Sequence, residues 1–395
     1  MGNAIPPSGF LLVALLLVAL NLRAPLTSLP PVVGQVSAAL GLTPAQAGLL
    51  TSVPVLCFAL LTPPASALVA RLGPERAVLI AVAGVVAGQA VRSAGTVPAA
   101  LAGTALLGAG ITIGNVAVPV VIARDFLSRS AAVTGAYSAT MNVGSALTTT
   151  LTVPLAAQWG WQWALAGWGV LAVVALVVWG RASRGVAPPA TAAAPGPARA
   201  AHGGSARLGR PMALLTALLC VAFAGQASSY YAMTAWLPEI LHARLGLGAG
   251  AAGSLAAPFQ LCAVAGSLGV PLTLSRRVPV RWVSLAVTGM WLALPAGMLL
   301  APAAALAWIA LAGVAQGGNF TVIFTLIAQR APSVAAARRA SAVVQTLGYA
   351  CAAAAPTVLG AMHATTGGWT MPLVGVLALL GIMGGAMAVA TRPGR

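Results

Sequence analysis

Long apolar runs separated by short polar turns make up most of the chain, and they predict its architecture. A helix needs about 20 apolar residues to cross the hydrocarbon core of a bilayer. Twelve runs meet or approach this length: 10–38, 45–70, 77–95, 98–123, 131–157, 160–180, 212–241, 249–275, 282–300, 303–329, 341–364 and 370–390. Transmembrane barrel strands would alternate polar and apolar residues, whereas these runs are evenly apolar. We therefore expect an all-α membrane protein with twelve transmembrane helices.

One polar stretch interrupts this pattern for much longer than the others. Residues 181–210 are rich in Ala, Pro, Gly and Arg, a composition typical of flexible linkers. The stretch leaves six apolar runs on either side. We expect a six-helix bundle over residues 1–180, a cytoplasmic linker over 181–210 and a second six-helix bundle over 211–395.

A weak internal repeat supports this division. A shift of 205 residues places Cys57 on Cys262. A shift of 204 residues places Gly114-Asn115 of the fourth run on Gly318-Asn319 of the tenth. Two parallel repeats related by an axis along the membrane normal are typical of transporters that bind their substrate between the halves, near the middle of the membrane. We expect two pseudo-symmetric bundles with such a site.

The composition excludes a water-soluble protein and the charge predicts an orientation. Hydrophobic residues make up 59% of the chain and charged residues 6%, whereas soluble proteins carry about 25% charged residues. All 20 basic residues are arginines, and 17 of them follow every second apolar run. Because cytoplasmic loops are arginine-rich, both termini are predicted to be cytoplasmic. The net charge of +17 indicates attraction to the anionic lipids of the inner leaflet rather than nucleic-acid binding.

Three arginines lie outside these cytoplasmic clusters. Arg92 and Arg244 fall in loops on the opposite side, and Arg23 falls in the middle of the first run. A charged side chain at that depth costs about 3 kcal/mol on insertion scales, so Arg23 should face a cavity or a partner. A guanidinium without a buried carboxylate is suited to bind an anion. The alternative is a structural arginine bonded to backbone carbonyls that Pro25 and Pro30-Pro31 release from the helix.

Further deep polar groups recur at helical spacing and need partners inside the protein. They either line a central cavity or join helices to one another, which is a common role of such residues. Our candidate substrate-binding residues are Arg23, Asn21, Asn115, Asn142, Gln226, Tyr230, Gln260, Gln316, Asn319 and Gln345.

Other kinds of site find little support in the sequence. The four cysteines are scattered without a metal-ligand or disulfide spacing, so we expect no metal and no cofactor. Acidic residues and histidines are absent from the middle of every run, which excludes the usual membrane-embedded enzyme. Proton relays also rely on such residues. A proton could still be the coupling ion, carried by the substrate or by Glu239, and we expect a monomer.

Several segments resemble the cyanate/nitroimidazole transporter family of the major facilitator superfamily. The resemblance is most specific at Asn21-Leu22-Arg23, followed by Pro25-Leu26-Thr27-Ser28. Residues 48–54 and the run from Tyr230-Tyr231 to Pro238 are similar to that family too. The resemblance implies secondary transport of small solutes, such as cyanate or nitroimidazole-type compounds, across the inner membrane of a bacterium.

The loop after the second run differs from the superfamily's usual pattern, Gly-x-x-x-Asp-Arg-x-Gly-x-Arg. Ser66 stands in place of its glycine and Ala70 in place of its aspartate. The missing aspartate leaves open how the cytoplasmic gate is held shut, and Asp125 is a possible substitute. The candidate gating residues are Arg71, Gly73, Glu75, Arg76 and Asp125.

These features together predict a secondary active transporter rather than an enzyme. It would work by alternating access and move a small anionic solute, such as cyanate or an organic carboxylate, with Arg23 binding the charge. The alternative is an efflux pump for neutral or weakly basic compounds, such as nitroimidazoles or other drugs, in which Arg23 is structural.

Overall fold

The computed structural model describes residues 9–126, 130–184 and 210–392, nearly all of them helical. The first half of the chain forms α1 (Gly9–Asn21), α2 (Ala24–Thr27), η1 (Pro30–Val32), α3 (Val33–Leu40), α4 (Pro44–Leu72), α5 (Pro74–Arg92), α6 (Val97–Asp125), α7 (Ser130–Gly167) and α8 (Gly169–Ala182). The second half forms α9 (Arg210–Leu245), α10 (Ala249–Ala256), α11 (Pro258–Ser275), α12 (Val280–Leu300), η3 (Pro302–Ala304), α13 (Ala305–Arg330), α14 (Val334–Thr366) and α15 (Thr370–Ala390).

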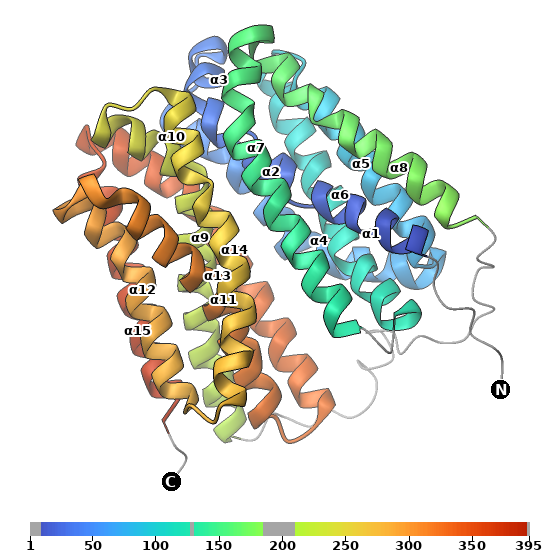
Figure 1. Cartoon of the computed structure of the whole chain (residues 1–395), viewed down its shortest axis with the longest axis vertical. Coiled ribbons are helices and arrows are strands. Elements are labelled where there is room, and N and C mark those ends of the chain that lie inside the picture. Colours follow the sequence, from blue (N-terminus) through green and yellow to red (C-terminus); the bar gives the residue numbers. More distant parts are fainter. Residues whose placement is uncertain (1–8, 127–129, 185–209, 393–395) are drawn as a thin grey trace.

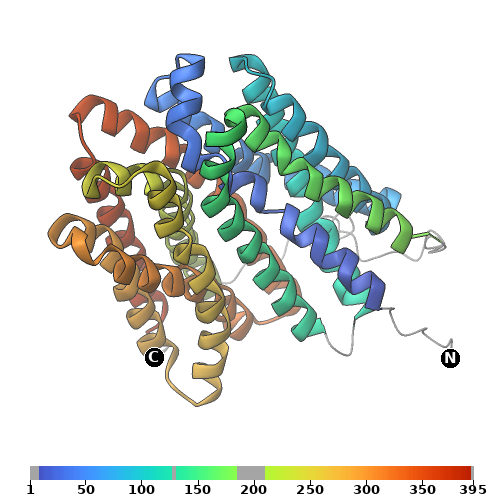
Figure 2. The same cartoon turned by 45° about the horizontal axis from the view of Figure 1, so that its top comes forward.

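The helices gather into two groups that follow the two halves of the sequence. Figure 1 shows α1–α8, coloured blue to green, packed beside α9–α15, coloured yellow to red, and the turned view of Figure 2 shows the same division. Leu107, Ile111 and Trp179 are fully buried in the core of the first group. Trp291 and Ile309 are fully buried in the core of the second. The linker predicted over 181–210 lies mostly outside the described residues.

Successive candidate spans reverse direction, so the turns between them lie at alternate ends of the molecule. One end holds the turns that join α4 to α5, α11 to α12 and α13 to α14, and we call it the arginine-rich end because Arg71, Arg276 and Arg330 lie there. The opposite end holds the turns that join α3 to α4, α5 to α6 and α14 to α15.

The described residues contain eleven candidate membrane spans, one fewer than the sequence predicts. The difference arises at residues 131–180, where one apolar segment, Val133–Ala182, counts as a single span of 50 residues. A straight helix of that length would be roughly 75 Å long, against about 30 Å of hydrocarbon. Gly160 breaks the helical geometry inside it, with φ 80° and ψ 159°. As a result, α7 and α8 run in opposite directions (Figure 1).

The first span is broken where the sequence places its prolines. Its helix stops at Asn21, resumes at Ala24–Thr27 with Pro25 in the first turn, and passes through the 3-10 turn Pro30–Val32 before α3. Thr27 on α2 hydrogen-bonds Thr148 on α7 over 2.8 Å. The break thus holds the residues around Arg23 away from a regular helix. A turn at Ala257, before Pro258, separates α10 from α11, but Ala249–Ser275 still counts as one candidate span, as the sequence predicts.

The two groups of helices meet tightly near the opposite end. Gly48 on α4 faces α14 so closely that an added Cβ would lie 2.7 Å from Thr357 Cα. Ser52, one turn further along α4, hydrogen-bonds Thr357 over 3.0 Å. Gly253 on α10 approaches α7, where an added Cβ would lie 2.7 Å from the Thr149 carbonyl oxygen. We call these contacts the seam, and small residues allow the close approach.

Candidate substrate-binding site

Arg23 lies at the break between α1 and α2, at the interface of the two helix groups. Its Nη1 donates a hydrogen bond to Asn142 Oδ1 on α7 over 2.8 Å. Its Cζ lies 5.2 Å from the ring centroid of Tyr230 on α9, within the range of a cation–π contact. Both partners are neutral, so the positive charge of the guanidinium is not cancelled by the residues that hold it.

A cavity of about 470 Å³ extends from Arg23 toward the arginine-rich end. It falls within the usual range for small-molecule sites, about 300–1,000 Å³. Both helix groups line it: Thr62 and Pro119 contribute from α4 and α6, and Ser267 and Phe320 contribute from α11 and α13. These side chains lie between the level of Arg23 and the arginine-rich end of their helices, whereas the seam closes the other side.

All four tyrosines of the chain line this cavity together with Arg23. They are Tyr137, Tyr230, Tyr231 and Tyr349. Phe58 adds a fifth ring, whose centroid lies 5.9 Å from that of Tyr349 and 6.3 Å from that of Tyr231. The site therefore combines one guanidinium with several aromatic faces, an arrangement suited to a flat solute that carries an anionic or strongly polar group.

Six further predicted site residues also reach this cavity: Asn115, Asn142, Gln226, Tyr230, Gln316 and Gln345. Asn115 accepts a hydrogen bond from Tyr137 over 3.3 Å. Gln226 accepts one from the Trp291 ring nitrogen over 2.9 Å and donates one to the Gln316 carbonyl oxygen over 3.0 Å. These bonds fix the amide groups at the wall of the cavity.

Three predicted site residues lie away from the cavity lining. Asn21 donates to the carbonyl oxygens of Leu17 and Leu171 over 2.8 and 3.2 Å, which joins α1 to α8. Gln260 accepts a hydrogen bond from Tyr230 over 3.2 Å and supports that ring from behind. Asn319 is fully buried near Met383 on α15, so it does not share the environment of Asn115, its counterpart in the repeat.

The candidate gating residues lie at the arginine-rich end of the first helix group. Glu75 at the start of α5 and Asp125 at the end of α6 both pair with Arg124. Arg71 and Arg76 are exposed, and Gly73 forms the turn between α4 and α5 with φ 82°. Both acids therefore belong to an ion cluster inside one helix group, centred on Arg124, which the sequence did not single out.

Arg92 is not a loop residue on the membrane surface, as the sequence predicts, but a buried one. It is the last residue of α5, is 3% exposed, and donates to the Pro25 carbonyl oxygen over 2.8 Å. The polar turn that follows it, Ser93–Thr96, drew the prediction toward the surface. Sequence reasoning also missed Tyr137, although it lies on the same run, 131–157, as the predicted site residue Asn142. In the described part of the chain, no group of three or more potential ligand residues could hold a metal ion.

Comparison with known proteins identifies the class of protein that this fold and cavity define. Residues 11–356 match the model of the Major Facilitator Superfamily. The chain belongs to this superfamily of membrane transporters.

Two curated relatives are similar over nearly the full length of the chain. The 2-nitroimidazole transporter of Escherichia coli (strain K12) is 36% identical over 93% of this chain and 92% of its own. The cyanate transport protein CynX of the same organism is 29% identical over 91% of this chain and 92% of its own. The resemblance predicted from the first-span motif is confirmed, and the family is one of transporters rather than enzymes.

The fold is also similar to solved transporter structures. A bacterial homologue of the human lysosomal transporter Spinster, in an inward-facing and unoccupied conformation, matches with a TM-score of 0.76. The match covers 99% of this chain and 98% of that one at 16% identity, so it supports the fold alone. The chain is a secondary transporter whose cavity lies between two groups of helices.

Proposed function

We propose that the solute is small, linear or planar, and negatively charged, as cyanate and organic carboxylates are. The observation that carries this proposal is the guanidinium of Arg23, held at the cavity by neutral partners, Asn142 and Tyr230. The two oxygens of a carboxylate match the planar fork of a guanidinium. A cationic solute would meet uncompensated positive charge in the same place.

A neutral nitroheterocycle is the second candidate, and the aromatic lining of the cavity favours it. A nitro group also presents two coplanar oxygens to Arg23, and the rings of Tyr231, Tyr349 and Phe58 would pack against a heteroaromatic ring. The relative at 36% identity is a 2-nitroimidazole transporter. For export of such compounds, Arg23 would bind a dipole instead of a full charge.

We further propose twelve spans in two bundles, residues 1–180 and 211–395, joined by a linker over 181–210. The break at Gly160 and the opposite directions of α7 and α8 support two crossings within Val133–Ala182. By the charge rule for short loops, the arginine-rich end and both termini face the cytoplasm. The cavity would then open inward, with the seam closing the outer side.

Alternating access would proceed by rocking of the two bundles about the site. The seam would part in the outward-facing state, while the start of α5 and the end of α6, with their Arg124–Glu75–Asp125 cluster, would approach the second bundle and close the inner side. We place the protein in a bacterial inner membrane as a monomer. Exposed Arg276, Arg277 and Arg281 would face anionic lipid, and protons remain a candidate coupling ion.

Counterflow in proteoliposomes tests the solute class. The panel contains cyanate, benzoate, 2-nitroimidazole and the cation choline, each measured with the unmodified protein, Arg23→Lys and Arg23→Gln. Arg281→Gln removes an equal charge from an exposed position and is the matched control. We expect exchange of the anions or of 2-nitroimidazole, its loss in Arg23→Gln and partial retention in Arg23→Lys. Exchange of choline, or normal exchange in Arg23→Gln, would contradict the proposal.

A further inference from the structure

Arg92 is a second cation buried in the first helix group, beyond Arg23 on the seam side. Its Nη1 donates to the Pro25 carbonyl oxygen over 2.8 Å and its Nη2 to Ser28 Oγ over 3.2 Å. Its Nε has no hydrogen-bond partner among the described residues. Both acceptors belong to the broken segment of the first span, close behind Arg23 in the sequence.

The charge of Arg92 has no protein counter-charge in the described structure. The chain has three acidic residues. Glu75 and Asp125 pair with Arg124 at the arginine-rich end, and Glu239 forms no salt bridge with a described residue. Burying an ion costs several kcal/mol unless an opposite charge compensates it. A neutral donor could make the same hydrogen bonds to the Pro25 carbonyl oxygen and to Ser28 Oγ. These bonds therefore do not explain why a charged residue is buried here.

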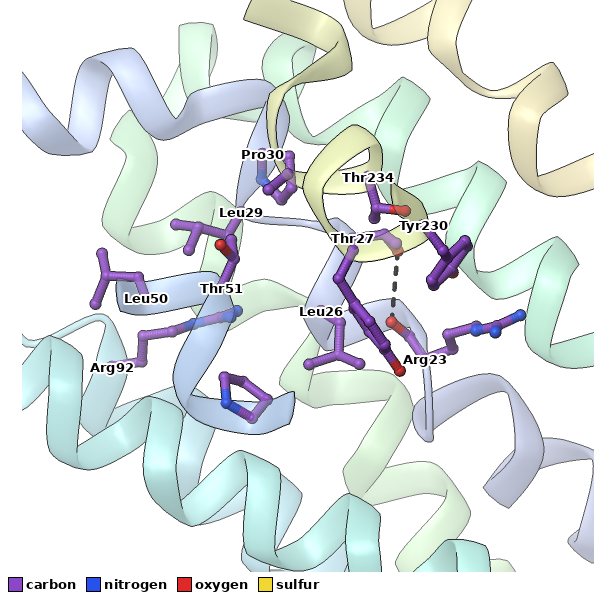
Figure 3. A pocket seen from close by; sticks show the side chains of 13 residues that line it. Arg23, Leu26, Thr27, Leu29, Pro30, Leu50, Thr51, Arg92, Tyr230 and Thr234 are labelled. Carbon is purple, nitrogen blue, oxygen red and sulfur yellow. Dashed lines mark hydrogen bonds between the residues drawn. The ribbon is translucent and has the colours of Figure 1, made fainter. Parts of the chain in front are cut away.

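The space beside Arg92 continues the substrate cavity past Arg23. Both arginines line a narrow pocket of about 20 Å³, together with the hydroxyl-bearing residues Thr27, Thr51 and Thr234. Figure 3 shows the Arg92 side chain reaching toward Thr51, and the Arg23 side chain pointing away from Arg92, past Tyr230. This volume holds about one water molecule and no solute.

This narrow pocket lies at the interface that must part in the outward-facing state. Leu50, Thr51 and Pro54 of α4 line it from one helix group, and Thr234 and Ala235 of α9 line it from the other. Thr51 is one turn from Gly48, whose close contact with α14 closes the seam. Parting of the two groups would therefore enlarge this pocket and connect it to the seam side of the membrane.

We propose that Arg92 is a second anion-binding station, on the outer half of the path. It binds a small anion, or the oxygen pair of a nitro or carboxylate group, when the seam is open, and Arg23 receives the same group when the seam closes. This inference rests on the proposed function for its direction of movement. Anion binding at Arg92 depends only on this residue and the pocket around it, so it can be tested without a transport assay.

Labelling of a cysteine in this pocket with charged reagents, added from the outer side, measures the electrostatic potential beside Arg92. The four free cysteines, Cys57, Cys220, Cys262 and Cys351, are replaced by alanine, and Thr51→Cys is introduced. Right-side-out vesicles are treated with an anionic reagent, methanethiosulfonate ethylsulfonate, or with its cationic trimethylammonium analogue. The labelling rate of the anionic reagent divided by that of the cationic reagent reports the sign and strength of the local electrostatic potential. A cleft lined by positive charge concentrates anions and excludes cations.

We expect the anionic reagent to react faster, and the rate ratio to fall about tenfold in Arg92→Gln but not in Arg92→Lys. External thiocyanate should slow the anionic reaction while Arg92 is present, and this measurement needs no Arg92 variant to fold. An unchanged ratio in Arg92→Gln, no protection by thiocyanate, or no labelling by either reagent would overturn the proposal. Failure of the Arg23 transport test would leave these outcomes unaffected, so the two proposals fail separately.

Discussion

The guanidinium of Arg23 donates a 2.8 Å hydrogen bond to the amide oxygen of Asn142, which ties the broken first span to α7 at the edge of the cavity. The amide holds the guanidinium in place and leaves its charge available. Asn142→Asp would place a carboxylate at the same distance, and that carboxylate would compete with the solute for Arg23. We expect binding of cyanate or 2-nitroimidazole to weaken by about tenfold or more, and by less in Asn142→Ala.

Purified variants with radiolabelled solute provide this measurement, and their unfolding temperatures show whether the fold is retained. Equal effects of Asp and Ala at position 142 would mean that the charge of Arg23 does not act on the solute.

Gly114 on α6 sets the position of Leu22, the residue before Arg23. An added Cβ at position 114 would lie 3.2 Å from Leu22 Cδ1 and 3.4 Å from its Cγ, so a larger side chain must displace the buried Leu22 side chain, and we expect the first span to shift at its break. We expect Gly114→Val to destabilise the protein by about 1–3 kcal/mol, the usual cost of overpacking, and to weaken solute binding.

Thermal unfolding in detergent measures the first effect. Gly135→Val is the control, because an added Cβ there has no atom within 4 Å. A wild-type unfolding temperature in Gly114→Val would show that Leu22 relaxes without consequence for the fold.

Gly48 controls the closure of the seam. An added Cβ would lie 2.7 Å from Thr357 Cα and 2.8 Å from the Pro356 carbonyl oxygen, and backbone atoms cannot move aside as a side chain can. We expect Gly48→Val to hold the two helix groups apart at this end and to favour the seam-open state. Spin labels at Gln46 and Thr365, both exposed, would report a longer distance between α4 and α14. The same distance as in the unmodified protein would rule out this role for Gly48.

Gln226 connects three helices through its side-chain amide. It accepts a hydrogen bond from buried Trp291 and donates one to the Gln316 backbone. Gln226→Leu would leave the Trp291 ring nitrogen buried without an acceptor, at a cost of about 1–3 kcal/mol. We expect a lower unfolding temperature, which the double variant Gln226→Leu, Trp291→Phe partly restores. No restoration in the double variant would show that the amide stabilises the bundle by another route.

The sequence predicted the features that depend on position along the span. A lone arginine in the middle of an apolar run has to face something polar, and prolines have to break a helix. Arg23 does reach the cavity, and the first span is broken around Pro25 and Pro30. The sequence also shows that glycine is abundant, as close helix packing requires. It does not show that Gly48 packs against Thr357 and Gly253 against Thr149.

The sequence could not predict which neighbour each polar side chain contacts, because that depends on how each helix is rotated about its axis. Nearly every helix face of this chain is apolar, so a single polar residue does not indicate which face of its helix points toward the cavity. Asn115 lines the cavity while Asn319 packs toward α15, although both occupy the same place in the repeat. Arg92 follows the same logic: its position at a helix end suggested the surface, and only the fold brings it onto the Pro25 carbonyl group.

The central claim is that Arg23 directly binds the negatively charged or strongly polar end of the solute. Equilibrium binding of radiolabelled cyanate and 2-nitroimidazole to purified Arg23→Gln, beside Arg281→Gln, tests it. A hydrogen bond to a charged group contributes about 1.5–3 kcal/mol, so affinity should fall about tenfold to a hundredfold in Arg23→Gln and remain unchanged in Arg281→Gln. A folded Arg23→Gln protein that binds either solute as tightly as the unmodified protein would contradict the claim.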